Sequence, residues 1–346
     1  MGFAVRAGAF VLAVGAIALL PRFISDFRAL QLGTVAIFFI ALLGLNILTG
    51  HAGQISLGHG AFMGIGGYTT AVLTSDFGGL SWEMNDLATV PIAGLVAGVV
   101  GFLFGFPALR LAGVYLALAT FALAVALPSL ARSQKLAGIT GGSEGIILPR
   151  LPPTGDWLYY VCWSFALPMF VLAWLIVRGR LGRAFRAVRE SEIAAVSSGI
   201  SLPLYKTVAF GISAFYAGVA GALLAIPTTA IFPDTYPVAL SIILLTGVVV
   251  GGLGSLAGMA IGALFIQFIQ TDGPQWLQAV LDRVGVDINE TAPGVPSVLY
   301  GLLLLAVLLT ARSGVAGLLA RGVSVLTNRI YHRPIKRQAT PSRREA

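Results

Sequence analysis

The sequence predicts an all-α protein, a polytopic integral membrane protein with about ten transmembrane helices. The prediction rests on a high apolar fraction, a scarcity of charge and a series of long charge-free stretches. Of the 346 residues, 57% are apolar and only 10% are charged, against about 25% in a typical soluble domain. The mean hydropathy is +0.89. So few charges cannot cover a soluble globule, so this composition excludes water-soluble enzymes, and its hydrophobicity excludes a disordered chain.

Ten stretches lack Asp, Glu, Lys and Arg, and each is expected to form a membrane-spanning helix. They are residues 7–20, 29–48, 59–74, 90–106, 111–130, 157–177, 207–226, 237–253, 255–270 and 294–311. Several are shorter than the roughly 20 residues of a full crossing, which is tolerated where neighbouring helices cover the freed backbone. Glycine pairs four residues apart, such as Gly94/Gly98 and Gly101/Gly105, predict close packing between helices.

The basic residues predict the orientation of these spans. With ten spans both termini lie on one side, and that side carries 16 Lys and Arg residues against 6 on the other. The positive-inside rule makes the richer side cytoplasmic. Residues 1–311 then form the transmembrane domain, and residues 312–346 form a basic cytoplasmic tail, amphipathic at first and then disordered, that contacts membrane lipid rather than nucleic acid. A signal peptide is the alternative for the first span, but no small-x-small cleavage site precedes Pro21.

Several kinds of chemistry are missing from the sequence. No predicted span contains an ionisable acid or base other than histidine, which argues against a proton- or cation-coupled secondary transporter and against a membrane-embedded enzyme. No phosphate-binding P-loop is present, so the chain itself is not expected to bind ATP. Cys162 is the sole cysteine, and no third ligand accompanies His51 and His59. We therefore expect no catalytic residue, no metal site and no cofactor.

The first informative segment is residues 44–62, where glycines and polar side chains interrupt two apolar stretches. Such a break is tolerated in a bilayer only where protein or water covers the freed backbone. Two interpretations stay open, a lining or hinge of a translocation path and a tight turn at the cytoplasmic surface. The candidate path residues, with two further threonines from later spans, are Asn46, Thr49, Gln54, Ser56, His59, Thr120 and Thr246.

The second informative segment is the long basic loop 178–206. Residues 183–198 favour a helix, and Gly199 suits its C-terminal cap. Arg183, Arg186 and Arg189 recur at helical spacing, and the small or apolar side chains that follow could enter a groove on a partner protein. An ordinary positive-inside loop is the alternative interpretation.

At these segments the chain resembles the LivM-type permease subunit of branched-chain amino acid ABC importers. The matching stretches are residues 44–68, 113–121 with 140–145, 182–222, and 246–262. The resemblance implies an importer half in a bacterial inner membrane, with the fold of the many-helix permeases. It also implies four kinds of partner: a second homologous permease, two cytoplasmic ATPase subunits that bind the ATP, a periplasmic binding protein and the surrounding lipid.

The resemblance also assigns roles to residues of the basic loop. The segment from Ala194 to Gly199 resembles the ATPase-docking loop of ABC importers, although Ile193 stands where that loop usually has Glu, and Glu192 lies one place earlier. Related permeases carry branched-chain amino acids, urea, short amides or aromatic acids, so these solutes are the alternative substrates. The candidate docking residues are Arg183, Arg186, Arg189, Glu190, Glu192, Ala194, Ala195 and Gly199.

Overall fold

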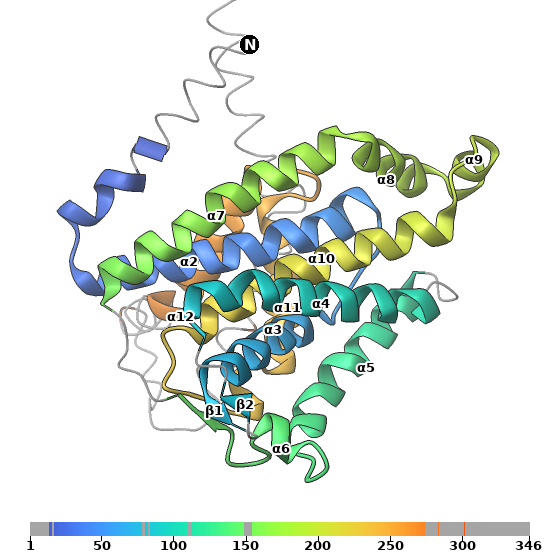
Figure 1. Cartoon of the computed structure of the whole chain (residues 1–346). Helices are drawn as coiled ribbons and strands as arrows, with labels where there is room; N and C mark the ends of the chain where they lie inside the picture. Colours follow the sequence, from blue (N-terminus) through green and yellow to red (C-terminus); the bar gives the residue numbers. More distant parts are fainter. Residues whose placement is uncertain are drawn as a thin grey trace, which may run out of the picture.

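The computed structural model describes most of the first 273 residues. It covers residues 14–273 except 16, 78–79, 82–83, 109–112 and 149–153, together with the isolated positions 283 and 301. The predicted spans 7–20 and 294–311 lie largely or almost wholly outside the described residues, and so does the predicted tail 312–346. Helices dominate the described part (Figure 1).

Six helical segments in the described part are long and apolar enough to cross a membrane. They contain α2 (Asp26–Leu45), α4 (Asp86–Ala108), α5 (Val114–Ala131), α7 (Gly155–Arg178), α10 (Leu202–Ala225) and α11 (Val238–Gly251). Two shorter apolar helices, α3 (His59–Thr74) and α12 (Gly258–Thr271), coincide with two further predicted spans. A helix satisfies its own backbone groups where no water is available, which is why apolar stretches of this kind become helices. The all-α prediction is confirmed, whereas the total of ten spans stays a prediction.

The short elements gather at the two ends of the helix bundle. Figure 1 shows α8 and α9 at one end and β1, β2 and α6 at the opposite end. At the latter end β3 pairs with β4 in antiparallel fashion, and Arg132 Nη2 lies 2.5 Å from Asp234 Oδ1. These elements are 3-10 helices η1 (Leu20–Phe23) and η3 (Pro233–Thr235), strands β1 (Asp76–Phe77), β2 (Leu80–Ser81), β3 (Ile146–Ile147) and β4 (Ala230–Ile231), and helices α6 (Ala137–Thr140), α8 (Arg180–Glu190) and α9 (Glu192–Ser197).

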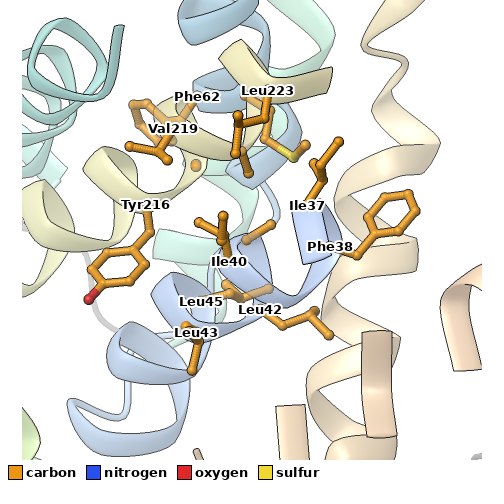
Figure 2. Close-up of a cluster of buried hydrophobic side chains, with 14 of the residues drawn as sticks. Ile37, Phe38, Ile40, Leu42, Leu43, Leu45, Phe62, Tyr216, Val219 and Leu223 are labelled. Carbon is orange, nitrogen blue, oxygen red and sulfur yellow. The ribbon is translucent and has the colours of Figure 1, made fainter. Parts of the chain in front are cut away.

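Helix α2 forms the centre of the core. Every residue from Val35 to Leu45 is buried, and the helix contacts α7, α10, α11 and α12. Figure 2 shows Ile40 and Leu42 of α2 among side chains that include Tyr216 and Leu223 of α10. The apolar segment of α2 is 89% buried, whereas that of the similarly apolar α7 is 33% buried, so α2 lies inside the bundle.

Glycines form the seam along which α10 packs on α4 and α3. Cβ atoms added at Gly94, Gly98, Gly101 and Gly105 of α4 would each meet atoms of α10. A Cβ atom at Gly66 of α3 would overlap backbone atoms of α10. The prediction that glycines four apart mark close helix packing is therefore confirmed for α4.

Candidate functional site

The predicted break between two spans is a bend that turns back beside α2. After Leu45 the chain continues as a π-helix, η2 (Asn46–His51), and Gly53 then adopts a positive φ of 72°, a conformation that glycine adopts without a steric penalty. Helix α3 begins at His59, whose Nε2 lies 3.0 Å from the carbonyl oxygen of Ala41. Ala41 lies within α2, so residues 52–58 run back along that helix and α3 starts inside the bundle.

Three hydroxyl groups bind backbone amides at the buried start of α3. Leu57 N donates to Thr120 Oγ1 at 2.9 Å, Gly58 N to Ser56 Oγ at 3.3 Å, and Gly60 N to Ser241 Oγ at 2.9 Å. The first amides of a helix lack partners within the helix. The side chains from α5, α11 and the break itself therefore supply acceptors where water is absent. We call Ser56, Thr120 and Ser241 the hydroxyl cluster.

The histidine that starts α3 completes this arrangement. His59 is 1% exposed, and its Nδ1 lies 3.4 Å from Ser213 Oγ of α10. His51, at the end of η2, has its Nδ1 3.2 Å from the carbonyl oxygen of Asn46. Each histidine thus contacts a carbonyl of the α2–η2 segment. Within the described part of the chain, no three His, Cys, Asp or Glu side chains are close enough to hold a metal ion.

The candidate path residues separate into three places. Ser56, His59 and Thr120 meet at the start of α3. Asn46, Thr49 and Gln54 lie around η2, where they bind backbone groups. Thr246 lies apart in α11 and donates to Ile242 O of its own helix. All seven are at most 9% exposed. The hydroxyls of Thr49, Ser56 and Thr120 bind backbone groups of residues 54–58. The side chains of Asn46, Gln54 and His59 instead bind backbone groups of neighbouring elements.

Two residues of the site, Ser213 and Ser241, carry no signal that the sequence analysis used. Each is a lone serine in an apolar helix, and serines of that kind often bond only to their own helix. Their role depends on the position of α10 and α11 beside the start of α3. A search for hydroxyl residues on glycine-rich spans would have included both.

The predicted docking helix is two helices, and the expectation of one helix over 183–198 is wrong. Helix α8 ends at Glu190, and Ser191 has an extended backbone with φ −160°. Its hydroxyl accepts from Ala194 N at 3.3 Å and starts α9. Serine is a favoured N-cap, because its oxygen binds a free first-turn amide. Gly199, at φ 79°, follows the C-cap of α9 as predicted.

Of the small and apolar side chains predicted to dock, Ile193 and Ala194 are exposed on α9 and Ala195 is buried. Ile193 is 83% exposed and Val196 is 55% exposed, whereas Ala195 is only 2% exposed. Ala195 therefore packs inside its own chain, and the expectation that it enters a groove on a partner is wrong. Ala194 is exposed beside Ile193, so the available docking surface is the opposite side of α9.

Charged residues line a cavity of about 160 Å³ between the docking helices and the break. Lys206 Nζ lies 2.6 Å from Glu192 Oε1, and Gln54 Nε2 donates to the carbonyl oxygen of Lys206 at 3.4 Å. Arg189 also lines the cavity, and its guanidinium donates to the carbonyl oxygen of Gly50. Helix α8 thus contacts the break directly through Arg189, whereas α9 is joined to it through Lys206 of α10.

The remaining candidate docking residues lie on the outer surface of α8. Arg183, Arg186 and Glu190 are exposed, while Ala184, Phe185 and Val188 form the buried face of the helix. Arg186 Nη1 donates to the carbonyl oxygen of Val177 at 3.1 Å. Helix α8 is therefore amphipathic, with a basic face that is free to meet a partner.

The chain combines long apolar helices with a polar break inside the bundle, where hydroxyl groups bind the first amides of α3. Amphipathic helix α8 lies at one end. These features are those of a multi-pass membrane permease. The family described as branched-chain amino acid transport system / permease component matches residues 29–308. The chain belongs to this permease family.

Two curated relatives support the assignment. They are the high-affinity branched-chain amino acid transport system permease proteins LivM of Salmonella typhimurium and of Escherichia coli K12. Each is 34% identical to this chain over 295 residues, which is 77% of this chain and 68% of the relative. No solved structure matched the chain significantly.

Proposed function

We propose that this chain translocates branched-chain amino acids as one permease of an ATP-driven importer in a bacterial inner membrane. A second homologous permease, two cytoplasmic ATPases and a periplasmic binding protein complete the importer. The observation that carries the proposal is the direct contact between the docking helix α8 and the break before α3, made by Arg189 at Gly50 and Gly53. That contact joins a surface suited to a soluble partner with a polar segment inside the bundle.

The docking helices and the transmembrane domain have separate tasks. Ile193 and Val196 on α9 supply an exposed apolar surface, and α8 supplies exposed arginines. ATP is bound and hydrolysed by the partner subunits, so this chain is not itself an enzyme. Residues 1–311 form the transmembrane domain and residues 312–346 a cytoplasmic tail, with both termini in the cytoplasm.

The polar break before α3 suits a small zwitterionic solute. Hydroxyl groups and backbone dipoles can contact a zwitterion without placing a fixed charge in the membrane. Among the described residues that meet at the hydroxyl cluster, none is acidic, and none is Lys or Arg. Driving force then comes from ATP outside this chain rather than from an ion that binds within it.

Uptake by the reconstituted importer tests the proposal. The chain is co-expressed with candidate ATPase, permease and binding-protein partners, the complex is placed in liposomes, and uptake of radiolabelled leucine is followed. We expect uptake that requires ATP on the cytoplasmic side and leucine-loaded binding protein outside. Competition by urea, acetamide and benzoate distinguishes the alternative substrates. Uptake driven by a proton or sodium gradient without ATP would contradict the proposal.

A further inference from the structure

Three elements meet at the end of η2. Asn46 Oδ1 accepts from Gly254 N at 2.8 Å, and Gly254 lies in the turn between α11 and α12 with φ 85°. On the other side, the guanidinium of Arg189 at the end of α8 donates to Gly50 O. The short helix η2 is therefore held between the docking helix α8 and the α11–α12 turn.

Both the aliphatic part and the guanidinium of Arg189 contact the break. A Cβ atom at Gly53 would lie 2.9 Å from Arg189 Cγ, so the aliphatic part of the arginine packs on the bare backbone there. The guanidinium reaches Gly50, three residues earlier. One side chain thus spans the turn from residue 50 to residue 53, and this turn leads directly to the hydroxyl cluster.

The guanidinium donates to Gly50 O from Nη1, while Arg189 as a residue is exposed. Arginine carries its charge on a planar group that forms directed hydrogen bonds, and a backbone carbonyl is a good acceptor for it. A movement of α8 therefore pulls on Gly50, and the chain from Gly50 to Gly60 carries the displacement to the buried start of α3. Only a few residues separate the two ends of this connection.

We propose that Arg189 is a positioning residue that couples movement of the docking helices to the break, rather than a residue that binds the ATPase. The inference rests on the proposed function, since it assigns the transmitting contact within an ATP-driven permease. In this view the docking surface for the ATPase lies around Ile193 on α9, and the contact that transmits movement lies at Arg189 on α8.

Arg189→Met tests the proposal, because methionine keeps an unbranched stem on Gly53 and removes the donor to Gly50. Arg180→Met is the matched control, since Arg180 is an exposed arginine at the start of the same helix. The reconstituted importer is assayed for subunit stoichiometry, ATP hydrolysis and leucine uptake. We expect Arg189→Met to retain its ATPases and to hydrolyse ATP. Its leucine uptake per ATP should fall roughly tenfold, the size of effect known for residues that modulate coupling between sites.

Rescue distinguishes a transmitting contact from a general structural role. Arg189→Lys retains a cationic donor for Gly50 O, so its uptake per ATP should exceed that of Arg189→Met. Loss of the ATPases from the Arg189→Met complex would overturn the proposal, because Arg189 would then be a docking residue. Unchanged uptake per ATP, or a lysine variant no better than the methionine variant, would overturn it too. If the wild-type importer shows no ATP-dependent uptake, the proposed function itself fails.

Discussion

Ser241→Ala removes the acceptor for one backbone amide at the buried start of α3. Ser241 is 0% exposed, and its Oγ lies 2.9 Å from Gly60 N. Gly60 is also buried and occupies the second position of α3, where no helical carbonyl is available. The alanine variant therefore leaves an N–H group without an acceptor and out of reach of water.

The expected loss follows from the cost of an unpaired buried donor. Such a group destabilises a folded protein by about 1–3 kcal/mol. At about 2 °C for each kcal/mol, the midpoint of thermal unfolding should fall by about 2–6 °C. Thr120→Val removes a second hydroxyl that binds a different amide, Leu57 N. The two hydroxyls serve the same short segment, so their losses are expected to be coupled, and the double variant measures that coupling as its departure from the sum of the two single losses.

The assay uses the sole cysteine of the chain. Cys162 in α7 is 0% exposed, so a thiol-reactive fluorogenic dye labels it only as the purified protein unfolds in detergent. Ser164→Ala is the matched control, because Ser164 is exposed on the same helix and its hydroxyl donates to Val161 O of its own turn. If Ser241→Ala unfolds at no lower temperature than Ser164→Ala, the amide of Gly60 does not depend on this hydroxyl and the reasoning is wrong.

Three further predictions concern the surface and the seams of the molecule. In intact cells an impermeant thiol reagent should label Glu144→Cys but not Ser198→Cys, and the reverse pattern would contradict the predicted orientation. Ile193→Asp places a charge on the exposed tip of α9, so pull-down of the ATPase should fall severely while the permease still unfolds at its normal temperature. Gly66→Ala forces a methyl group into the backbone of α10 and should cost about 1–3 kcal/mol in the Cys162 assay. Gly138→Ala, where nothing lies within 4 Å of the new methyl group, should unfold normally.

The sequence predicted those parts of the fold that depend on composition and local spacing. The charge-free stretches gave the helices, and the glycines of α4 indicated its close packing against another helix. The polar side chains between Gly44 and Phe62 located the break, because an interrupted apolar stretch is conspicuous in a membrane protein. These predictions need no knowledge of which helices become neighbours.

The geometry of the site could not be predicted, because it depends on contacts between distant segments. Thr120 and Ser241 meet the break across 63 and 181 residues of sequence. The division of the docking helix at Ser191 was readable, since serine followed by Glu192 is a typical helix start. The helical spacing of the arginines ends at Arg189, inside α8, so it indicates a helix only as far as Glu190. Burial of Ala195 within its own chain likewise follows from the turn at Ser191.

The seam between α3, α4 and α10 has a consequence for how the chain is made. Gly66 and Gly218 are about 150 residues apart, and their backbones meet directly. At about 5–20 residues per second, synthesis takes roughly 8–30 s to pass from one to the other. During that interval the grooves on α3 and α4 face lipid or the insertion machinery. The tightest part of the bundle is therefore the last part of this region to assemble, and a nascent chain halted before α10 lacks it altogether.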